Sequence, residues 1–144
     1  MDKKQIALAS LRKKFNCAQS VFYAFAEDVG MEKEVALKVS TCFGGGMRCG
    51  ETCGAITGIL MAIGMKYGSN IEDDETVQYL AYKKEIEFIK RFKEKRGTIL
   101  CKELLGCDAS TPEDMQKVVE KGLHITVCSK VIVEAIEIAE ELLF

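Results

Sequence analysis

The stretch CGAITGILMAIGMKY, which runs from Cys53 to Tyr67, decides the fold. Its residues would be apolar on nearly every side of a helix, and a helix that is apolar all round belongs in a protein interior. Thr52 comes directly before it and can cap its first turn. The most apolar part, Ala55 to Met65, is shorter than the roughly 20 residues that cross a bilayer. We therefore predict a central, buried helix and no membrane span.

Small residues recur at intervals of four along this helix, at Gly54, Gly58 and Ala62. Residues four apart lie on one face of a helix, so this face allows another helix to pack closely. The absence of a side chain at Gly54 also leaves room beside Cys53 for a metal, a sulfide or a disulfide partner.

A glycine-rich loop, residues 44–50, leads into the helix. Gly45 and Gly50 have the spacing of the two glycines in a phosphate-binding loop, but Glu51 stands where that loop needs a lysine. Because a carboxylate repels phosphate, we predict no useful affinity for ATP. We expect the glycines to permit tight turns and close backbone approach beside Cys53. The expected cofactor-binding positions are Gly44, Gly45, Gly46 and Gly54.

Other periodic apolar segments predict further helices around the central one. Asn16 and Gln19 form a capping-box pattern, and Thr111-Pro112 combines a cap residue with a proline at the first helical position. No alternating strand pattern competes with them. The predicted fold class is therefore all-α, a compact helical bundle in one domain that spans residues 1–144. The predicted helices cover residues 4–13, 16–30, 32–43, 53–67, 73–96, 98–106, 111 onward and 126–143.

Composition excludes several classes of protein. Hydrophobic residues make up 48% of the chain, so it is expected to be globular. The 20 Lys and Arg nearly balance the 22 Asp and Glu, which gives no electrostatic reason to expect a nucleic-acid partner. The N-terminus contains no apolar run of signal-peptide length. We therefore expect a cytoplasmic protein with neither a nucleic-acid nor a membrane partner.

Seven cysteines are the most informative feature of the composition, because an odd number in a reducing compartment favours metal binding or redox chemistry. Four of them, Cys17, Cys53, Cys101 and Cys128, fall at predicted helix starts, where backbone N–H groups favour a thiolate and lower its pKa. Cys101 and Cys128 also lie on apolar arcs, so they point inward. Inward-pointing thiols can converge on one buried site. The alternative is four separate core cysteines, since free cysteine is often buried.

The local motifs are less specific. Cys49 and Cys53 have C-x-x-x-C spacing, which differs from the C-x-x-C of thioredoxin-like redox sites and zinc ribbons. His124 is the sole histidine, so a histidine-rich zinc site and a Ser-His-Asp triad are poorly supported. Its position after Gly122 suggests a loop or cap residue.

Five segments form an ordered set: Asn16-Cys17-Ala18-Gln19-Ser20, Gly44-Gly45-Gly46, Thr52-Cys53-Gly54-Ala55-Ile56-Thr57-Gly58, Cys101-Lys102-Glu103-Leu104-Leu105-Gly106 and Cys128. This set resembles the C_GCAxxG_C_C family of redox-active proteins. The family is named for a Cys-Gly-Ala-x-x-Gly core, and the resemblance runs from Cys17 to Cys128. It implies redox behaviour, and it maps the four family cysteines onto those selected above from helix starts. Against this pattern Cys42, Cys49 and Cys107 are extra, so a Cys49–Cys53 partnership would be peculiar to this chain.

Two forms of redox site remain open. The four cysteines can ligate an iron–sulfur cluster, which takes four thiolates, or they can cycle between dithiol and disulfide, which takes two. The alternatives are a structural zinc site and a metal-free helical interaction protein. We expect Cys53 to be the most reactive cysteine, with Cys49 as its possible second thiol. The sequence names neither the redox partner nor a reaction, so enzymatic activity stays open.

The segment Asp73 to Arg96 predicts a helix with an apolar arc over about half its circumference, wider than the ~100° that a surface helix needs. A homodimer through this helix is one hypothesis. Burial of the arc within the same chain is the alternative.

Overall fold

The protein is described by a computed structural model over residues 1–143, so Phe144, the last residue of the predicted domain, lies outside the described part. Within residues 1–143 there are helices and no strand, which confirms the all-α prediction. None of these helices has both the length and the apolar character needed to cross a membrane. The α-helices are α1 (Lys3–Arg12), α2 (Cys17–Ala26), α3 (Lys33–Val39), α4 (Gly54–Tyr67), α5 (Glu75–Arg96), α6 (Cys101–Leu105), α7 (Pro112–Glu120) and α8 (Ser129–Leu143).

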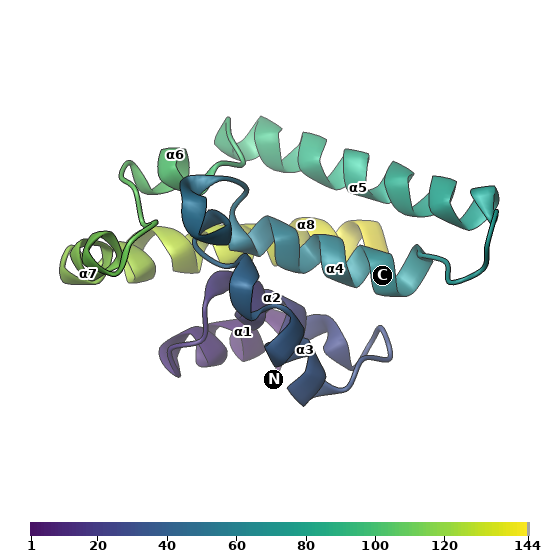
Figure 1. The fold of residues 1–144 in the computed structure, drawn as a ribbon, viewed down its shortest axis with the longest axis horizontal. Helices are drawn as coiled ribbons and strands as arrows, with labels where there is room; N and C mark the ends of the chain where they lie inside the picture. Colours follow the sequence, from purple (N-terminus) through teal and green to yellow (C-terminus); the bar gives the residue numbers. More distant parts are fainter. Residues whose placement is uncertain (144) are drawn as a thin grey trace.

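Helix α4 lies in the centre of the molecule, as its composition predicts. In Figure 1, α5 runs along one side of it, α8 lies behind it, and α1 to α3 cover the opposite side. Side chains from α2, α4, α5 and α8 fill one hydrophobic cluster. The largest fully buried ones are Phe22, Phe25, Ile56, Ile59, Phe88, Phe92, Ile132 and Ile136.

Helix α2 packs closely on the small-residue face of α4, which confirms that prediction. A Cβ added at Gly58 would lie 2.9 Å from the carbonyl oxygen of Ala18, and one added at Gly54 would lie 2.8 Å from the Ala18 amide nitrogen. Real Cβ atoms do not approach the backbone so closely, so α2 and α4 can meet only where these positions lack a side chain.

Two predicted helix starts are confirmed by their hydrogen bonds. The Asn16 side chain accepts from the Gln19 amide at 2.9 Å, and the Gln19 side chain accepts from the Asn16 amide at 3.0 Å, which completes the capping box of α2. Thr111 Oγ1 accepts from the Asp114 amide at 3.1 Å at the start of α7.

The predicted cap at Thr52 and the predicted start of a later helix at Thr98 are wrong. Helix α4 begins at Gly54 with Cys53 as its cap residue, and α6 begins at Cys101 with Leu100 as its cap residue; neither cap makes a side-chain hydrogen bond. The reason is that Thr52 and Leu100 pair as an isolated antiparallel bridge, which holds both segments extended up to their helices. The third predicted helix also stops early, at Val39, and a short 3₁₀ turn, Thr41–Phe43, replaces its end.

Candidate functional site

A cavity of about 930 Å³ lies at the end of the bundle where α1, α2, α4, α6 and α7 meet the segment before α8. All four cysteines predicted from helix starts line it: Cys17, Cys53, Cys101 and Cys128. Cys53 and Cys101 are buried, and Cys17 and Cys128 are half-buried. Thiols that are far apart in the sequence therefore share one cavity.

The bridge between Thr52 and Leu100 positions two of these cysteines. The Cys53 amide donates to the Ile99 carbonyl, and the Cys101 amide donates to the Glu51 carbonyl, both at 2.7 Å. These two bonds tie the start of α4 to the start of α6. Cys17, the first residue of α2, reaches the cavity from the capping box at Asn16.

Cys128 occupies a different place in the secondary structure from the one predicted. It is the last residue of a π turn, His124–Cys128, that runs directly into α8. The Thr126 amide already donates to the Gly122 carbonyl at 3.0 Å, so the helical segment starts before the predicted boundary and Cys128 is not in a first turn. Single π turns inside helices occur frequently at functional sites.

The Cys17 and Cys128 thiols both line the cavity, and each shifts the pKa of the other. Cys17 donates to Cys128, and this bond, together with burial, raises the pKa of the Cys17 thiol well above its ordinary value. The same bond lowers the pKa of Cys128, because it stabilises a thiolate there. The pair is therefore polarised, with Cys128 as the better nucleophile and Cys17 as the proton donor.

Cys53 and Cys101 have the opposite character from the one predicted. Burial raises the pKa of Cys53 to about 12, although hydrogen bonds from the Ala55 and Ile56 amides at the helix start lower it. Burial likewise raises the pKa of Cys101 to about 11, and the nearby Cys128 raises it further. Desolvation of the thiolate thus outweighs the helix start, so the predicted low pKa of Cys53 is wrong.

Cys49 is not on the cavity with Cys53. It is exposed on the glycine loop, where its thiol donates to the Gly46 carbonyl at 3.3 Å. Exposed Cys42 and half-buried Cys107 also do not belong to the cavity lining.

The predicted cofactor glycines divide into two groups. Gly45 and Gly54 line the cavity. At Gly44 and Gly46 other protein atoms occupy the space that a ligand would need. A Cβ at Gly44 would lie 2.3 Å from the Asn16 side chain, and one at Gly46 would lie 2.8 Å from the Cys101 Cβ. The close backbone approach predicted for this loop is confirmed, and its partners are the cysteine-bearing segments.

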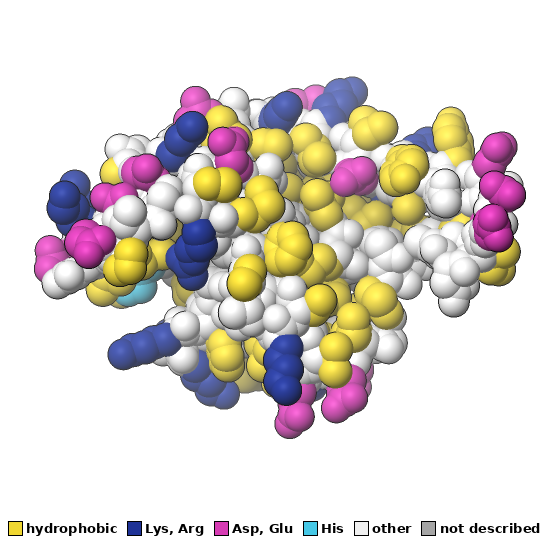
Figure 2. Space-filling model, viewed as in Figure 1, with side chains coloured by type: hydrophobic (Ala, Val, Ile, Leu, Met, Phe, Trp, Pro, Cys, Tyr) yellow, Lys and Arg dark blue, Asp and Glu magenta, His cyan; other side chains and the backbone are white. Residues whose placement is uncertain are grey.

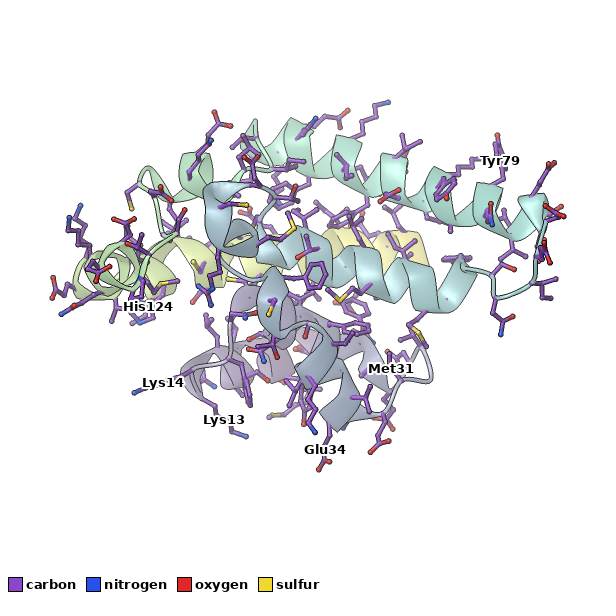
Figure 3. All side chains as sticks on the ribbon, in the orientation of Figure 1. Lys13, Lys14, Met31, Glu34, Tyr79 and His124 are labelled. Carbon is purple, nitrogen blue, oxygen red and sulfur yellow. The ribbon has the colours of Figure 1, made fainter. Side chains whose placement is uncertain are left out.

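The cavity lining also contains four basic residues that the sequence patterns did not indicate: Arg12, Lys14, Arg48 and His124. Figure 3 shows Lys14 and His124 on facing sides of the opening between α1 and α7. The His124 Nδ1 atom is buried without a hydrogen-bond partner among the described residues. The position of His124 after Gly122 suggested only a loop or cap residue and did not indicate that it lines the cavity.

Arg48 occupies an unusual backbone segment. Gly45, Gly46, Met47 and Arg48 have consecutive φ angles of 63°, 64°, 60° and 60°. A left-handed conformation costs a residue with a Cβ about 1–3 kcal/mol and concentrates at functional sites. Nothing in the residue types of Met47 and Arg48 indicates it, so the sequence could not have identified Arg48.

The four thiols match a cluster in number but not in arrangement. Among residues 1–143, no three His, Cys, Asp or Glu side chains form a group that could hold a metal ion. A dithiol needs only two neighbouring thiols, and Cys17 and Cys128 share this cavity.

Comparison with protein-family models finds that residues 15–142 match the family described as "Putative redox-active protein (C_GCAxxG_C_C)". Neither the comparison with curated proteins nor the comparison with solved structures finds a match.

Proposed function

This chain belongs to the C_GCAxxG_C_C family of redox-active proteins, and from this premise we propose that Cys17 and Cys128 form its redox-active dithiol. The observation that carries the proposal is that Cys17 and Cys128 share one cavity and shift each other's pKa in opposite directions. Cys53 and Cys101, whose pKa values are about 12 and about 11, stay protonated at neutral pH and form an uncharged wall beside the pair. The partner is an unidentified thiol or disulfide compound of the cytoplasm.

The reaction is a thiol–disulfide exchange. The Cys128 thiolate attacks one sulfur of a partner disulfide, the partner's S–S bond breaks, and one partner thiolate leaves. Cys17 then loses its proton and attacks the Cys128 sulfur, which forms the Cys17–Cys128 disulfide and releases the second partner thiolate. The protein loses two electrons and two protons, and the partner disulfide gains them as two thiols.

Ligation of an iron–sulfur cluster by Cys17, Cys53, Cys101 and Cys128 is a second proposal. It is supported by the number of thiols on one cavity, and four Cys ligands suit this group. A cluster would supply one-electron transfer. Among residues 1–143, however, no three potential ligands are grouped closely enough to hold a metal ion. This favours the dithiol over both a cluster and a structural zinc ion.

Anaerobic purification followed by metal analysis decides between these proposals. We expect substoichiometric iron and zinc and no visible absorption from a cluster. Equilibration in a dithiothreitol redox buffer should then give one reversible two-electron transition, and peptide mapping should assign the new disulfide to Cys17 and Cys128. Stoichiometric iron with acid-labile sulfide would contradict the dithiol and support the cluster.

A further inference from the structure

The cysteine cavity has a one-sided charge distribution. Its interior is mostly apolar, with leucine and valine side chains from α1, α6, α7 and α8 and with Ile125 from the turn before α8. Three cations line it, Arg12, Lys14 and Arg48, whereas no Asp or Glu of the described chain does so. Its volume of about 930 Å³ lies within the range of small-molecule sites.

The three cations are available to a ligand. All three are exposed, and none forms an ion pair with a carboxylate of residues 1–143. Figure 2 shows Lys and Arg side chains below the histidine at the same end of the molecule. The loop of left-handed residues places Arg48 on the cavity lining together with Cys53 and Cys101. A guanidinium in this place can pair with a carboxylate in two parallel hydrogen bonds.

We propose that this cavity binds an organic anion with an apolar body, whose acidic group pairs with Arg48 and whose apolar part contacts the cavity wall. Resting on the dithiol function proposed above, the substrate class is an apolar disulfide that carries carboxylates. Electrons then pass by the exchange already described, from Cys128 and Cys17 to the bound disulfide.

The test compares two small disulfides as oxidants of a parent variant. In this parent Cys42, Cys49 and Cys107 are changed to Ser, so that thiols outside the cavity do not contribute to the measured oxidation. Dithiobis(nitrobenzoate) is apolar and anionic, whereas dithiodipyridine is apolar and uncharged. Arg48→Gln should slow oxidation of the parent by the anion about fivefold, the effect of one partly exposed ion pair. It should change the rate with dithiodipyridine less than twofold.

Lys13→Gln is the matched control, because Lys13 is exposed next to two of the cations but does not line the cavity. It should leave both rates unchanged. Equal losses in Arg48→Gln and Lys13→Gln would overturn the anion site.

A second readout does not depend on the thiols. Anilinonaphthalenesulfonate, an apolar anion without a disulfide, should bind the parent and bind Arg48→Gln about fivefold more weakly. If neither disulfide oxidises the parent but this dye still depends on Arg48, the dithiol function fails while the binding site stands. Dye binding that is equal in Arg48→Gln and Lys13→Gln would overturn the site.

Helix α5 carries an independent feature, an exposed stripe with an acidic start, an apolar middle and a basic end. Tyr79, Tyr82 and Ile86 have exposed fractions of 69%, 59% and 67%, and Figure 3 shows Tyr79 pointing away from the body of the molecule. Glu75 precedes them on the same face and Lys90 follows, both exposed and without an ion-pair partner among residues 1–143. The buried face of α5 uses Ala81, Phe88 and Phe92 instead.

This stripe is complementary to itself in the antiparallel direction. With a two-fold axis between residues 82 and 83, Tyr79 meets Ile86 of a second copy, and Glu75 meets Lys90. We propose that two copies of the chain associate through antiparallel α5 helices. The apolar middle supplies burial and the charged ends fix the direction.

A charge swap tests the direction. We expect a concentration-dependent dimer by sedimentation. Glu75→Lys should weaken it roughly tenfold, because two ion pairs become repulsions, and Glu75→Lys with Lys90→Glu should restore it. A protein that is monomeric at all concentrations would overturn the dimer. A double variant as weak as Glu75→Lys would overturn the antiparallel arrangement. Circular dichroism should show equal helicity throughout.

Discussion

Cys53 of the native protein should react with iodoacetamide roughly a thousandfold more slowly than the same thiol in the unfolded chain. Its pKa of about 12 lies three units above the ordinary 9.0, and each unit removes tenfold of the reactive thiolate at neutral pH. Mass spectrometry of peptides from timed alkylation, in native buffer and in denaturant, measures the ratio. Exposed Cys42 is the internal control and should be labelled early in both.

The pH dependence gives the same prediction a second readout. Below pH 9 the thiol is protonated in the native and the unfolded protein. Between pH 9 and about 12 the unfolded chain loses a proton that native Cys53 keeps, so the free energy of unfolding should fall by about 1.4 kcal/mol per pH unit. Cys53→Ala should lack this part of the slope. A Cys53 labelled as fast as Cys42 would contradict burial as the dominant influence on this thiol.

Most of the fold could be predicted from local signals, since each depends on a few neighbouring residues. The capping box at Asn16 and the start at Thr111 act through their own hydrogen bonds, and the apolar segment after Cys53 has no stable place except the interior. The Thr52 cap failed because a residue far along the chain, Leu100, pairs with it. Such a long-range pairing leaves no local pattern.

The pKa values of the site's cysteines were harder to predict than which cysteines form the site. Helix starts selected the four cysteines that line the cavity, but they indicated lowered pKa values at all four. Burial reverses this at Cys53 and Cys101, and burial depends on the whole packing of the bundle. The lowered pKa of Cys128 is caused by the neighbouring Cys17 thiol, and the sequence could not show that these two residues are neighbours.

The two cysteines of the proposed dithiol should fail in different ways when each is replaced. Cys128→Ser removes the nucleophile and leaves Cys17, whose pKa is well above its ordinary value, so disulfide exchange should be lost almost completely. Cys17→Ser keeps a hydroxyl that can donate to Cys128 but removes the resolving thiol. This variant should therefore react once and accumulate a mixed disulfide at Cys128.

Intact-mass measurement after addition of dithiobis(nitrobenzoate) separates these outcomes, in the background that lacks Cys42, Cys49 and Cys107. Cys17→Ser should gain the mass of one nitrothiobenzoate group, Cys128→Ser should gain none, and the parent should lose two protons. Cys17→Ala adds a test of the hydrogen bond: without a donor, the pKa of Cys128 should rise and the adduct should form more slowly than in Cys17→Ser. Equal adduct formation in Cys17→Ser and Cys128→Ser would contradict the assignment of Cys128 as the attacking thiol.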